Sequence, residues 1–333
     1  MISAIIPVYN SEKTINFAIK GVLSQKKYNE VEVIVVDDGS TDMTAEKVRS
    51  FPNVRYFYQK NAGPASARNR GAREAKGDIL FFTDSDCIPP PDWIEKAIVH
   101  FNRVEVGVVS GTYDLIEGSN LLAKCIHMEI MHRHQERMPV YPKSFGSYNF
   151  CIRKKIFQEV GGFNEQYGSA SGEDNDLSYK ILKAGYKIYF EKGSRVKHHH
   201  TAQIGKYLRE QFNHGFWRVR MYLDHPDMMK GDDYTFWKDI VEPPLVIGLI
   251  VMGSLIFFYQ SAVMIFFILI FSLFFIEIFF GYLCVKNFSA GLFWAFAMLL
   301  RAFARTFGFV YGFSYFSAKK SNKPFKTLVL MII

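Results

Sequence analysis

Two aspartates stand directly behind an apolar run in the segment "ILFFTDSDCIPPPDW", which extends from Ile79 to Trp93. Only Ser85 separates Asp84 from Asp86, so two like charges are crowded at the end of a predicted buried strand. Neighbouring like charges destabilise one another, and a bound cation relieves that repulsion. The spacing therefore predicts a cation site at this strand end.

Polar residues also follow the first two predicted strands. "SAIIPVYN" ends at Asn10, and "VEVIVVDDGSTD" breaks at Asp37 and Asp38. These strands, together with "NVRYFYQ" and "GDILFFTDSD", alternate with helical segments, one of which is expected to begin at Pro64. Such alternation is typical of a mainly parallel sheet, in which ligands bind beyond the carboxyl ends of the strands. We therefore expect the polar clusters to form one site.

The composition changes sharply along the 333 residues, of which 49% are hydrophobic and 16% aromatic. The chain reads as a soluble α/β protein up to about Asp239, and residues 241–333 read as a membrane region. We expect membrane spans at about 244–259 and 261–285, joined by a tight turn at "YQSA", because roughly 20 apolar residues cross a bilayer. The two spans would form a hairpin.

A third apolar segment, at about 289–317, contains Arg301 and Arg305 on one helix face. That pattern favours an interfacial or re-entrant helix. Glu277 lies inside the second expected span, where a lone carboxylate is costly. Either Glu277 pairs with Arg301 or Arg305, or it faces water near the membrane boundary.

Charge and cysteine content favour an integral membrane protein whose catalytic domain faces the cytoplasm. The net charge is +8, which suits a protein that lies against anionic membrane lipids. Both flanks of a hairpin face the same side of the membrane, and positively charged flanks favour the cytoplasmic side. The basic residues are too dispersed to predict nucleic-acid binding. "MISAIIPVYN" lacks the apolar core of a secretory signal, and the four cysteines contain no CxxC pair. The lysines after the hairpin are Lys286, Lys319, Lys320, Lys323 and Lys326.

Several motifs occur together in a specific order: "IIPVYN", "VIVVDDGSTDMT", "NAGPASARNRGAREAKGDILFFTDSD", "GGFNE" and "GEDNDLSYKILKAGYKI". Over about residues 1–215 the chain resembles glycosyltransferase family 2, the inverting nucleotide-sugar transferases of the GT-A fold. The resemblance implies an α/β catalytic domain at 1–235 with a Rossmann-like, mainly parallel sheet. Residues 1–100 would bind the nucleotide-sugar and residues 101–235 would form the acceptor side, followed by the helical membrane hairpin.

The resemblance implies that "DSD" is a DXD motif holding a divalent metal, Mn²⁺ or Mg²⁺, against the diphosphate of the donor. Such cations favour oxygen ligands. Asp86 would ligate the metal directly, while Asp84 would lie near both metal and ribose. Asp38 would read the nucleobase, whereas Asp37 would only form the turn. The other expected nucleotide-sugar-binding residues are Pro7, Tyr9, Asn61, Arg68 and Ser85.

The resemblance also implies roles for two later clusters. In "GEDND", Asp174 would be the base that takes the proton of the acceptor hydroxyl, with Glu173 beside it. The alternative is that this pair only caps a helix. In "RVKHHHT", His198 is the favoured metal ligand and His200 the next, sharing one face of a strand. A solvated histidine loop is the competing interpretation.

Other polar residues receive weaker interpretations. Asp176 is expected to be structural, and "HMEIMHRH", with His127 and His134, is expected to be acceptor-side surface because it does not match HExxH. The QxxRW motif of processive relatives is absent, since Trp217 stands too late after Gln211. That absence disfavours a polymer synthase, although Gln211, Trp217 and Arg218 could still close over the donor.

The resemblance favours a membrane-anchored, metal-dependent, inverting enzyme. It would move one sugar from a nucleotide-sugar, UDP favoured, to a hydroxyl of a lipid-linked or cell-surface glycan precursor. A polyprenyl-phosphate sugar synthase is the first alternative, and "GEDND" argues against it because a phosphate acceptor needs little help from a base. A non-catalytic sugar-nucleotide-binding scaffold is the second alternative, which the intact aspartates disfavour.

Overall fold

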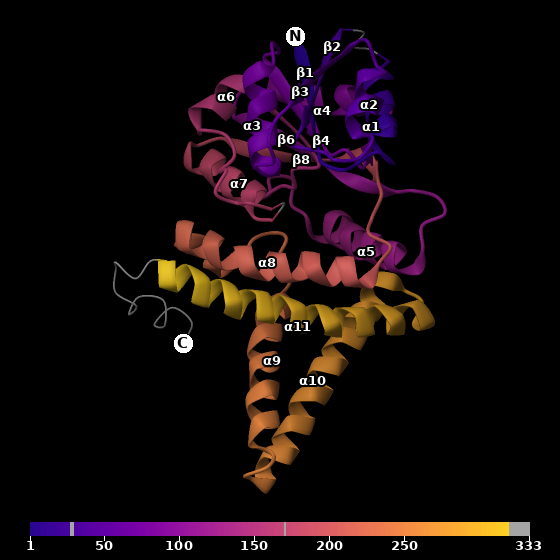
Figure 1. The fold of residues 1–333 in the computed structure, drawn as a ribbon. Helices are drawn as coiled ribbons and strands as arrows, with labels where there is room; N and C mark the ends of the chain where they lie inside the picture. Colours follow the sequence, from indigo (N-terminus) through magenta and orange to yellow (C-terminus); the bar gives the residue numbers. More distant parts are fainter. Residues whose placement is uncertain (27–29, 170, 320–333) are drawn as a thin grey trace. The chain divides into compact units, whose positions relative to one another are not determined.

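The computed structural model describes residues 1–26, 30–169 and 171–319 (Figure 1). The chain divides into two compact units. One lies within residues 1–202 and 232–234, and the other contains 203–231 and the residues from 235 onward. Sequence analysis placed the boundary at 235, so the division assigns two further helices, within residues 203–231, to the C-terminal unit. Lys320, Lys323 and Lys326 lie outside the described residues.

A sheet of eight described strands forms the centre of the N-terminal unit, in the order β3-β2-β1-β4-β7-β6-β8-β5. β1, β2, β3 and β4 are parallel to one another, whereas β7 is antiparallel to both β4 and β6. β6 and β8 are parallel, and β5 pairs antiparallel with β8. The strands are β1 (Ile2–Val8), β2 (Val31–Asp37), β3 (Val54–Tyr58), β4 (Ile79–Thr83), β5 (Cys87–Ile88), β6 (Val106–Leu115), β7 (Asn149–Arg153) and β8 (Lys187–His198).

Apolar side chains bury both faces of this sheet. Ile6 of β1 belongs to the core on one face, and its neighbour Ile5 belongs to the core on the other. Strands buried on both faces read as continuous apolar runs, which is why β1, β2 and β4 could be predicted from sequence. The parallel half confirms the expected sheet, and the remaining half is mixed.

Helices pack on both faces of the sheet and carry part of the site. The described helices of this unit are α1 (Ile15–Leu23), α2 (Thr44–Arg49), α3 (Pro64–Glu74), α4 (Trp93–Ile98), η1 (Val99–Asn102), α5 (Leu121–His132), η2 (Arg133–Arg137), α6 (Lys154–Glu159) and α7 (Glu173–Lys183). α3 begins at Pro64, as predicted. A Cβ on Gly71 would lie 2.4 Å from Cγ2 of Ile5, so this glycine lets α3 approach β1 closely.

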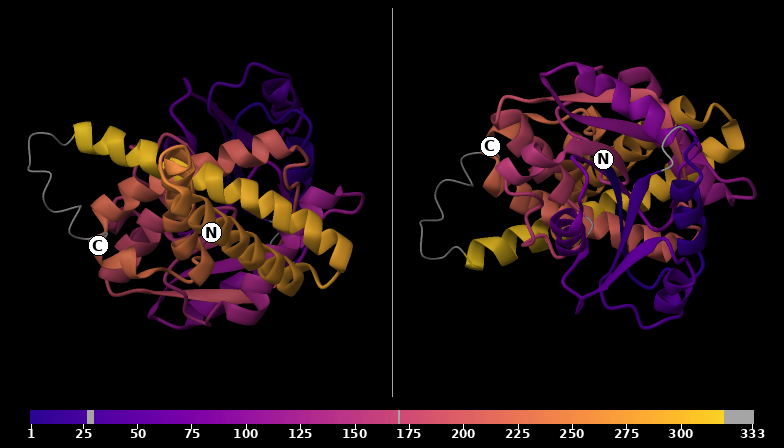
Figure 2. Two further views of the ribbon diagram at one scale, coloured as in Figure 1. Left: turned by 90° about the horizontal axis from the view of Figure 1, so that it is seen from below. Right: turned by 90° about the horizontal axis from the view of Figure 1, so that it is seen from above.

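The C-terminal unit consists of helices α8 (Ile204–Asp224), η3 (Pro226–Lys230), α9 (Trp237–Leu255), α10 (Gln260–Val285) and α11 (Phe288–Lys319). Figures 1 and 2 show α9 and α10 as a hairpin and α8 beside α11, with α11 crosswise to the hairpin. The turn of the hairpin occupies residues 256–259, just before the expected one.

Two described helices are long and apolar enough to cross a membrane: α10, with mean hydropathy 2.9, and residues 288–318 of α11, with 1.3. α9 is not among them, because it begins seven residues before the expected span and thereby includes Lys238, Asp239 and Glu242. The expected first span at 244–259 thus corresponds to the apolar part of α9, which ends at Leu255 and carries three charges in the residues before 244.

Glu277 has a partner that sequence analysis did not foresee. Its Oε2 accepts from Nζ of Lys238 at 3.1 Å, and Lys238 also pairs with Glu242. Arg305 instead pairs with Asp239 at 2.7 Å. The hypothesis of direct pairing with Arg301 or Arg305 overlooked Lys238 because the expected span began after it.

Candidate active site

The loops after β1 and β2 are joined by hydrogen bonds at the carboxyl edge of the sheet. The backbone N–H of Asn10 donates to Ser40 Oγ at 2.9 Å, and Thr41 N–H donates to Asn10 Oδ1 at 2.8 Å. The loop after β4 joins the same network, since Ser85 Oγ lies 2.8 Å from Ser11 Oγ. Three strand ends thus form one edge, as the alternation of strands and helices predicts.

Asp37 and Asp38 have different environments. Asp37 accepts from the N–H of Ser40 at 2.8 Å, which confirms it as a turn-former. Asp38 accepts from Gln59 Nε2 at 2.7 Å and from the backbone N–H groups of Ala62 and Gly63 at 2.9 and 2.8 Å. Asp38 therefore holds the segment around Asn61 against β2, and reading a nucleobase remains a prediction for it.

The expected donor-pocket residues differ in accessibility. Pro7 is buried within β1 opposite Val36, whereas Tyr9 at the strand end is 52% exposed. Asn61 is exposed, and its backbone N would lie 2.9 Å from a Cβ on Gly39. Tyr9 and Asn61 are thus reachable by a ligand, while Pro7 can only shape the edge from within.

Arg68 connects the two acidic motifs. Its Nη2 donates to Asp84 at 2.8 Å and its Nη1 donates to Glu173 at 3.0 Å, although the arginine is only 2% exposed. The guanidinium also lies over the ring of Phe163, 5.4 Å from its centroid. Sequence analysis expected Arg68 to bind the nucleotide-sugar, and that contact stays a prediction. The structure shows the guanidinium in a buried ionic bridge.

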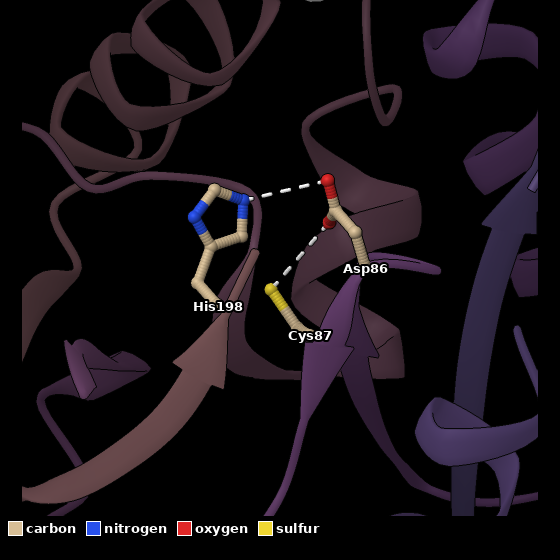
Figure 3. Close-up of side chains that lie close together, drawn as sticks. All are labelled: Asp86, Cys87 and His198. Carbon is tan, nitrogen blue, oxygen red and sulfur yellow. Dashed lines mark hydrogen bonds and ion pairs between the residues drawn. The ribbon is translucent and has the colours of Figure 1, made fainter. Parts of the chain in front are cut away.

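Asp86 and His198 face each other across the end of the sheet (Figure 3). β5 pairs with the end of β8 so that Cys87 stands opposite His198, and His198 Nε2 consequently lies 3.4 Å from Asp86 Oδ2. One ligand atom each from Asp86, Cys87 and His198 lies within 4.8 Å of the others. Among the described residues this is the group suited to hold a metal ion.

The donor set fits a divalent cation through oxygen and nitrogen. Asp86 offers a half-exposed carboxylate, and His198 offers an imidazole nitrogen, a ligand that Mn²⁺ accepts. Cys87 is fully buried, and burial together with the charges of Asp86 and Asp84 raises the pKa of its thiol well above the ordinary value. The thiol donates to Asp86 Oδ1 at 3.8 Å. The fit therefore rests on Asp86 and His198, with Asp84 turned toward Arg68.

His200 touches His198 rather than the carboxylate. The two Nδ1 atoms are 2.9 Å apart, and burial lowers the pKa of His200 to about 2, so this ring is neutral. A neutral His198 whose Nε2 faces a metal carries its hydrogen on Nδ1 and donates it to His200. The geometry thus makes His200 a support for His198. The expectation that both rings share one face agrees with their contact.

His127 and His134 are buried rather than at the surface. His134 is 1% exposed, its Nδ1 lies 2.5 Å from Thr112 Oγ1, and burial lowers its pKa to about 3. His127 is 9% exposed, and burial lowers its pKa as well. The expectation that these two rings lie at the surface is wrong, because α5 turns His127 inward and η2 turns His134 inward.

Glu173 and Asp174 occupy the first turn of α7 but have different exposure. Glu173 is 1% exposed, and burial together with the charge of Asp174 raises its pKa to about 7. Asp174 is half-buried, accepts from the backbone N–H groups of Asn175 and Ser147, and has a pKa raised by burial. Asp174 is therefore the carboxylate better placed to exchange a proton, while Glu173 anchors the turn to Arg68.

Several supporting residues escaped the sequence analysis. Asn69 donates to the carbonyl of Phe163 at 2.8 Å and accepts from its N–H at 2.9 Å, which fixes "GGFNE" against α3. The sequence carried a signal, because "ARNRG" and "GGFNE" were both parts of the ordered motif set. Asp176 pairs with Lys180 at 3.0 Å, as expected of a structural residue. Within the C-terminal unit, Oε1 of Gln211 accepts a hydrogen bond from Nε of Arg305 at 2.7 Å. The side-chain amide that was expected to close over the donor is therefore already bonded to this arginine.

The mixed sheet with its acidic carboxyl edge is the GT-A fold. A mannosyltransferase from Pyrobaculum calidifontis, solved in complex with GDP-Man and Mn²⁺, superposes with a TM-score of 0.51 at 21% identity, covering 67% of this chain and 63% of that one. Residues 3–161 match the model of glycosyl transferase family 2, and residues 127–206 match a model of the N-terminal domain of galactosyltransferase. Over residues 3–161, just under half of its length, the chain is thus similar to glycosyl transferase family 2.

Curated relatives are similar over the same region. The pre-mycofactocin glycosyltransferase of Mycobacterium tuberculosis is 29% identical over 238 residues, covering 68% of this chain and 48% of its own length. Glycosyltransferase AglE of Haloferax volcanii is 27% identical over 228 residues, covering 67% of this chain and 74% of its own. The chain thus spans about half the length of the mycobacterial relative.

Proposed function

We propose that this chain transfers a single sugar, with inversion, from a nucleotide-sugar to a hydroxyl of a lipid-linked or cell-surface glycan precursor. UDP is the favoured nucleotide, although the solved mannosyltransferase holds GDP-Man. The observation that carries the proposal is one connected site: Asp86 faces His198, and Asp84 is joined through Arg68 to the turn that holds Asp174.

The residues divide the reaction between them. Asp86 and His198 would hold the cation, with Mn²⁺ also present in the solved relative. A bound Mn²⁺ or Mg²⁺ neutralises charge on the departing diphosphate. Asp174 takes the proton of the acceptor hydroxyl as its oxygen attacks C1 of the sugar and the nucleoside diphosphate leaves. Attack from the face opposite the leaving group inverts the anomeric centre.

The membrane region supports a lipid-borne acceptor. α10 is apolar on all sides: its exposed side chains include Phe267, Phe271 and Phe275, at 50%, 67% and 71%. Surface of that kind is stable in hydrocarbon and not in water. We propose that the hairpin anchors the enzyme to a membrane, with the catalytic unit facing the cytoplasm. Anchoring confines the enzyme and a lipid-linked acceptor to one surface.

Release of nucleoside diphosphate from UDP-, GDP- and dTDP-sugars tests the proposal, with detergent-solubilised membrane lipids as acceptor. We expect release from one donor that requires Mn²⁺ or Mg²⁺, stops with EDTA and is strongly reduced in Asp174→Asn. Undiminished release by Asp174→Asn would favour a polyprenyl-phosphate acceptor. If the chain bound a nucleotide-sugar but released nucleoside diphosphate from none of them, the remaining interpretation would be a sugar-nucleotide-binding scaffold.

A further inference from the structure

The exposed face of α11 is a continuous apolar stripe. Leu292, Phe296, Phe307, Tyr311 and Tyr315 recur at near-helical spacing and are between 44% and 57% exposed. Residues three or four apart share one face of a helix, so these side chains form a single surface along α11. Such a long aromatic face needs an apolar covering.

The adjoining face of α11 is locked against α8, and the rings of Tyr311 and Tyr315 at the edge of the stripe lie 5.7 and 5.5 Å from the ring of Phe216. A Cβ on Gly308 would lie 2.0 Å from the carbonyl oxygen of Phe212, and one on Gly215 would lie 2.0 Å from that of Arg305. A Cβ on Gly312 would lie 2.6 Å from the Phe216 carbonyl. Near the start of both helices Tyr207 lies against Trp294, and further along Phe216 lies against Gly312. The helices α8 and α11 are therefore parallel, with their backbones touching.

Because α8 and α11 are packed together, both helices must have the same orientation relative to a bilayer. α8 is 21 residues long, about 31 Å, and carries charges at both ends and near its middle, among them Lys206, Arg209 and Arg218. A spanning α11 would carry this parallel helix through the hydrocarbon. Each charged side chain near the bilayer centre costs about 2.5–3.5 kcal/mol on insertion scales. α11 therefore cannot cross, although its length and composition would allow it.

The charged residues of the unit mark where the hydrocarbon begins. Lys238 bonds Glu277 at 3.1 Å, and Arg305 bonds Asp239 and Gln211 at 2.7 Å each, so α8, α9, α10 and α11 meet at one ionic cluster. From this cluster both arms of the hairpin extend about 26 Å at 1.5 Å per residue, close to the roughly 30 Å of a hydrocarbon core. Figures 1 and 2 show α11 crosswise to these arms.

We infer that α8 and α11 lie flat at the membrane interface, with the stripe of α11 buried among phospholipid acyl chains and only the hairpin entering deeply. The apolar surface of the hairpin continues into this stripe. Because the hairpin is proposed to enter the lipid, we expect lipid acyl chains to cover the stripe as well. The inference deepens the membrane anchorage proposed above and rests on it. It places both flanks of the hairpin, and the end of α11, on one side of the membrane.

Nitroxide depth measurements test this orientation on the full chain in phosphatidylethanolamine–phosphatidylglycerol liposomes. Leu292→Cys, Phe307→Cys and Tyr315→Cys are labelled one at a time, with the four native cysteines replaced by serine. We expect the three labels to lie at similar depth near the interface. A steady change in depth, approaching about 35 Å between the outer two at 1.5 Å per residue, would overturn the inference.

Epitope tags at both ends of the full chain provide an independent test in sealed, oriented vesicles. We expect protease to reach both tags in the same vesicles. Tags on opposite sides would overturn the in-plane orientation but leave anchorage intact. A protein washed from the vesicles by alkaline carbonate would instead show that the proposed anchorage itself fails.

Discussion

Arg68 links residues that lie 16 and 105 positions away, Asp84 and Glu173, through one buried guanidinium. Removing one partner of a buried ionic bridge leaves an uncompensated charge, which typically destabilises a protein by about 3–5 kcal/mol. We expect Arg68→Ala to lower the free energy of unfolding by that order, measured by denaturant titration in detergent. Arg70→Ala, on the same helix but bonded to the carbonyl of Tyr58, is the matched control and should change little.

Asp174 is the residue whose loss should separate binding from catalysis. Asp174→Asn keeps the shape of the side chain but cannot accept the acceptor proton, so transfer should fall by roughly 10²–10⁴-fold while donor binding persists. Steady-state transfer rates and donor titrations measure the two effects. A normal transfer rate in this variant would remove Asp174 from the mechanism.

The pH dependence of transfer follows from the same carboxylate. Burial raises the pKa of Asp174, so at a given acidic pH more of it is protonated than of a surface aspartate. A protonated base cannot take a proton. The acid limb of kcat/KM should therefore lie above pH 4 and rise with pH as Asp174 ionises, in surroundings charged by Glu173 and Arg68. A rate that stays flat down to pH 4 would contradict this assignment.

His198 and His199 are adjacent but face different surroundings. His198 lies against Asp86, whereas His199 is exposed. We expect His198→Ala to weaken Mn²⁺-dependent donor binding by at least about tenfold, the lower limit seen when even an outer-shell partner of a metal is lost. His199→Ala should bind as the wild type does. Equal effects of the two substitutions would favour the solvated histidine loop.

Among the secondary-structure elements, α8 and α11 depend on glycine at their contact. Gly308→Leu would push a side chain into the backbone of α8 and should lower the free energy of unfolding by about 1–3 kcal/mol, the usual range for overpacking. Thermal unfolding in detergent measures it. Gly205→Ala is the control, because nothing lies within 4 Å of its added Cβ. Equal melting temperatures would show that the two helices are not in contact.

The elements show what could and could not be predicted from sequence. The strands that end at Val8, Asp37 and Thr83 were predictable, because continuous apolar runs stop at polar clusters. The start of α9 was predicted seven residues too late, because Lys238 and Glu242 look incompatible with a helix that enters a membrane. In the structure Lys238 pairs with both Glu242 and Glu277. Ion pairs between distant residues leave no local pattern.

The site was predictable to a similar degree. Asp84, Asp86 and Asp174 were proposed because ordered motifs carry them, and His198 was proposed from the resemblance. The structure brings Asp86 and His198 together, while the roles of all four stay predictions. The bridge through Arg68 was not, since no spacing rule connects α3 to the first turn of α7. The position of Cys87 opposite His198 and the inward-facing ring of His134 likewise depend on how β5 and η2 pack.

At the scale of the whole molecule, the chain combines an α/β unit similar to glycosyl transferase family 2 with a unit of apolar helices. We propose that the second unit holds the first at a membrane surface, where a lipid-linked acceptor is concentrated. Truncation after Gly231 would leave α8 without α11 and expose its apolar face, so the full chain is the form to study.

The central claim is that Asp86 and His198 hold a cation that binds a nucleotide-sugar. Calorimetric titration of the detergent-solubilised full chain with UDP-, GDP- and dTDP-sugars, with and without Mn²⁺, tests it most directly. The account predicts binding of one nucleotide class that requires Mn²⁺ and is lost in Asp86→Ala. Unchanged binding in folded Asp86→Ala, or no binding of any donor by the folded wild type, would contradict it.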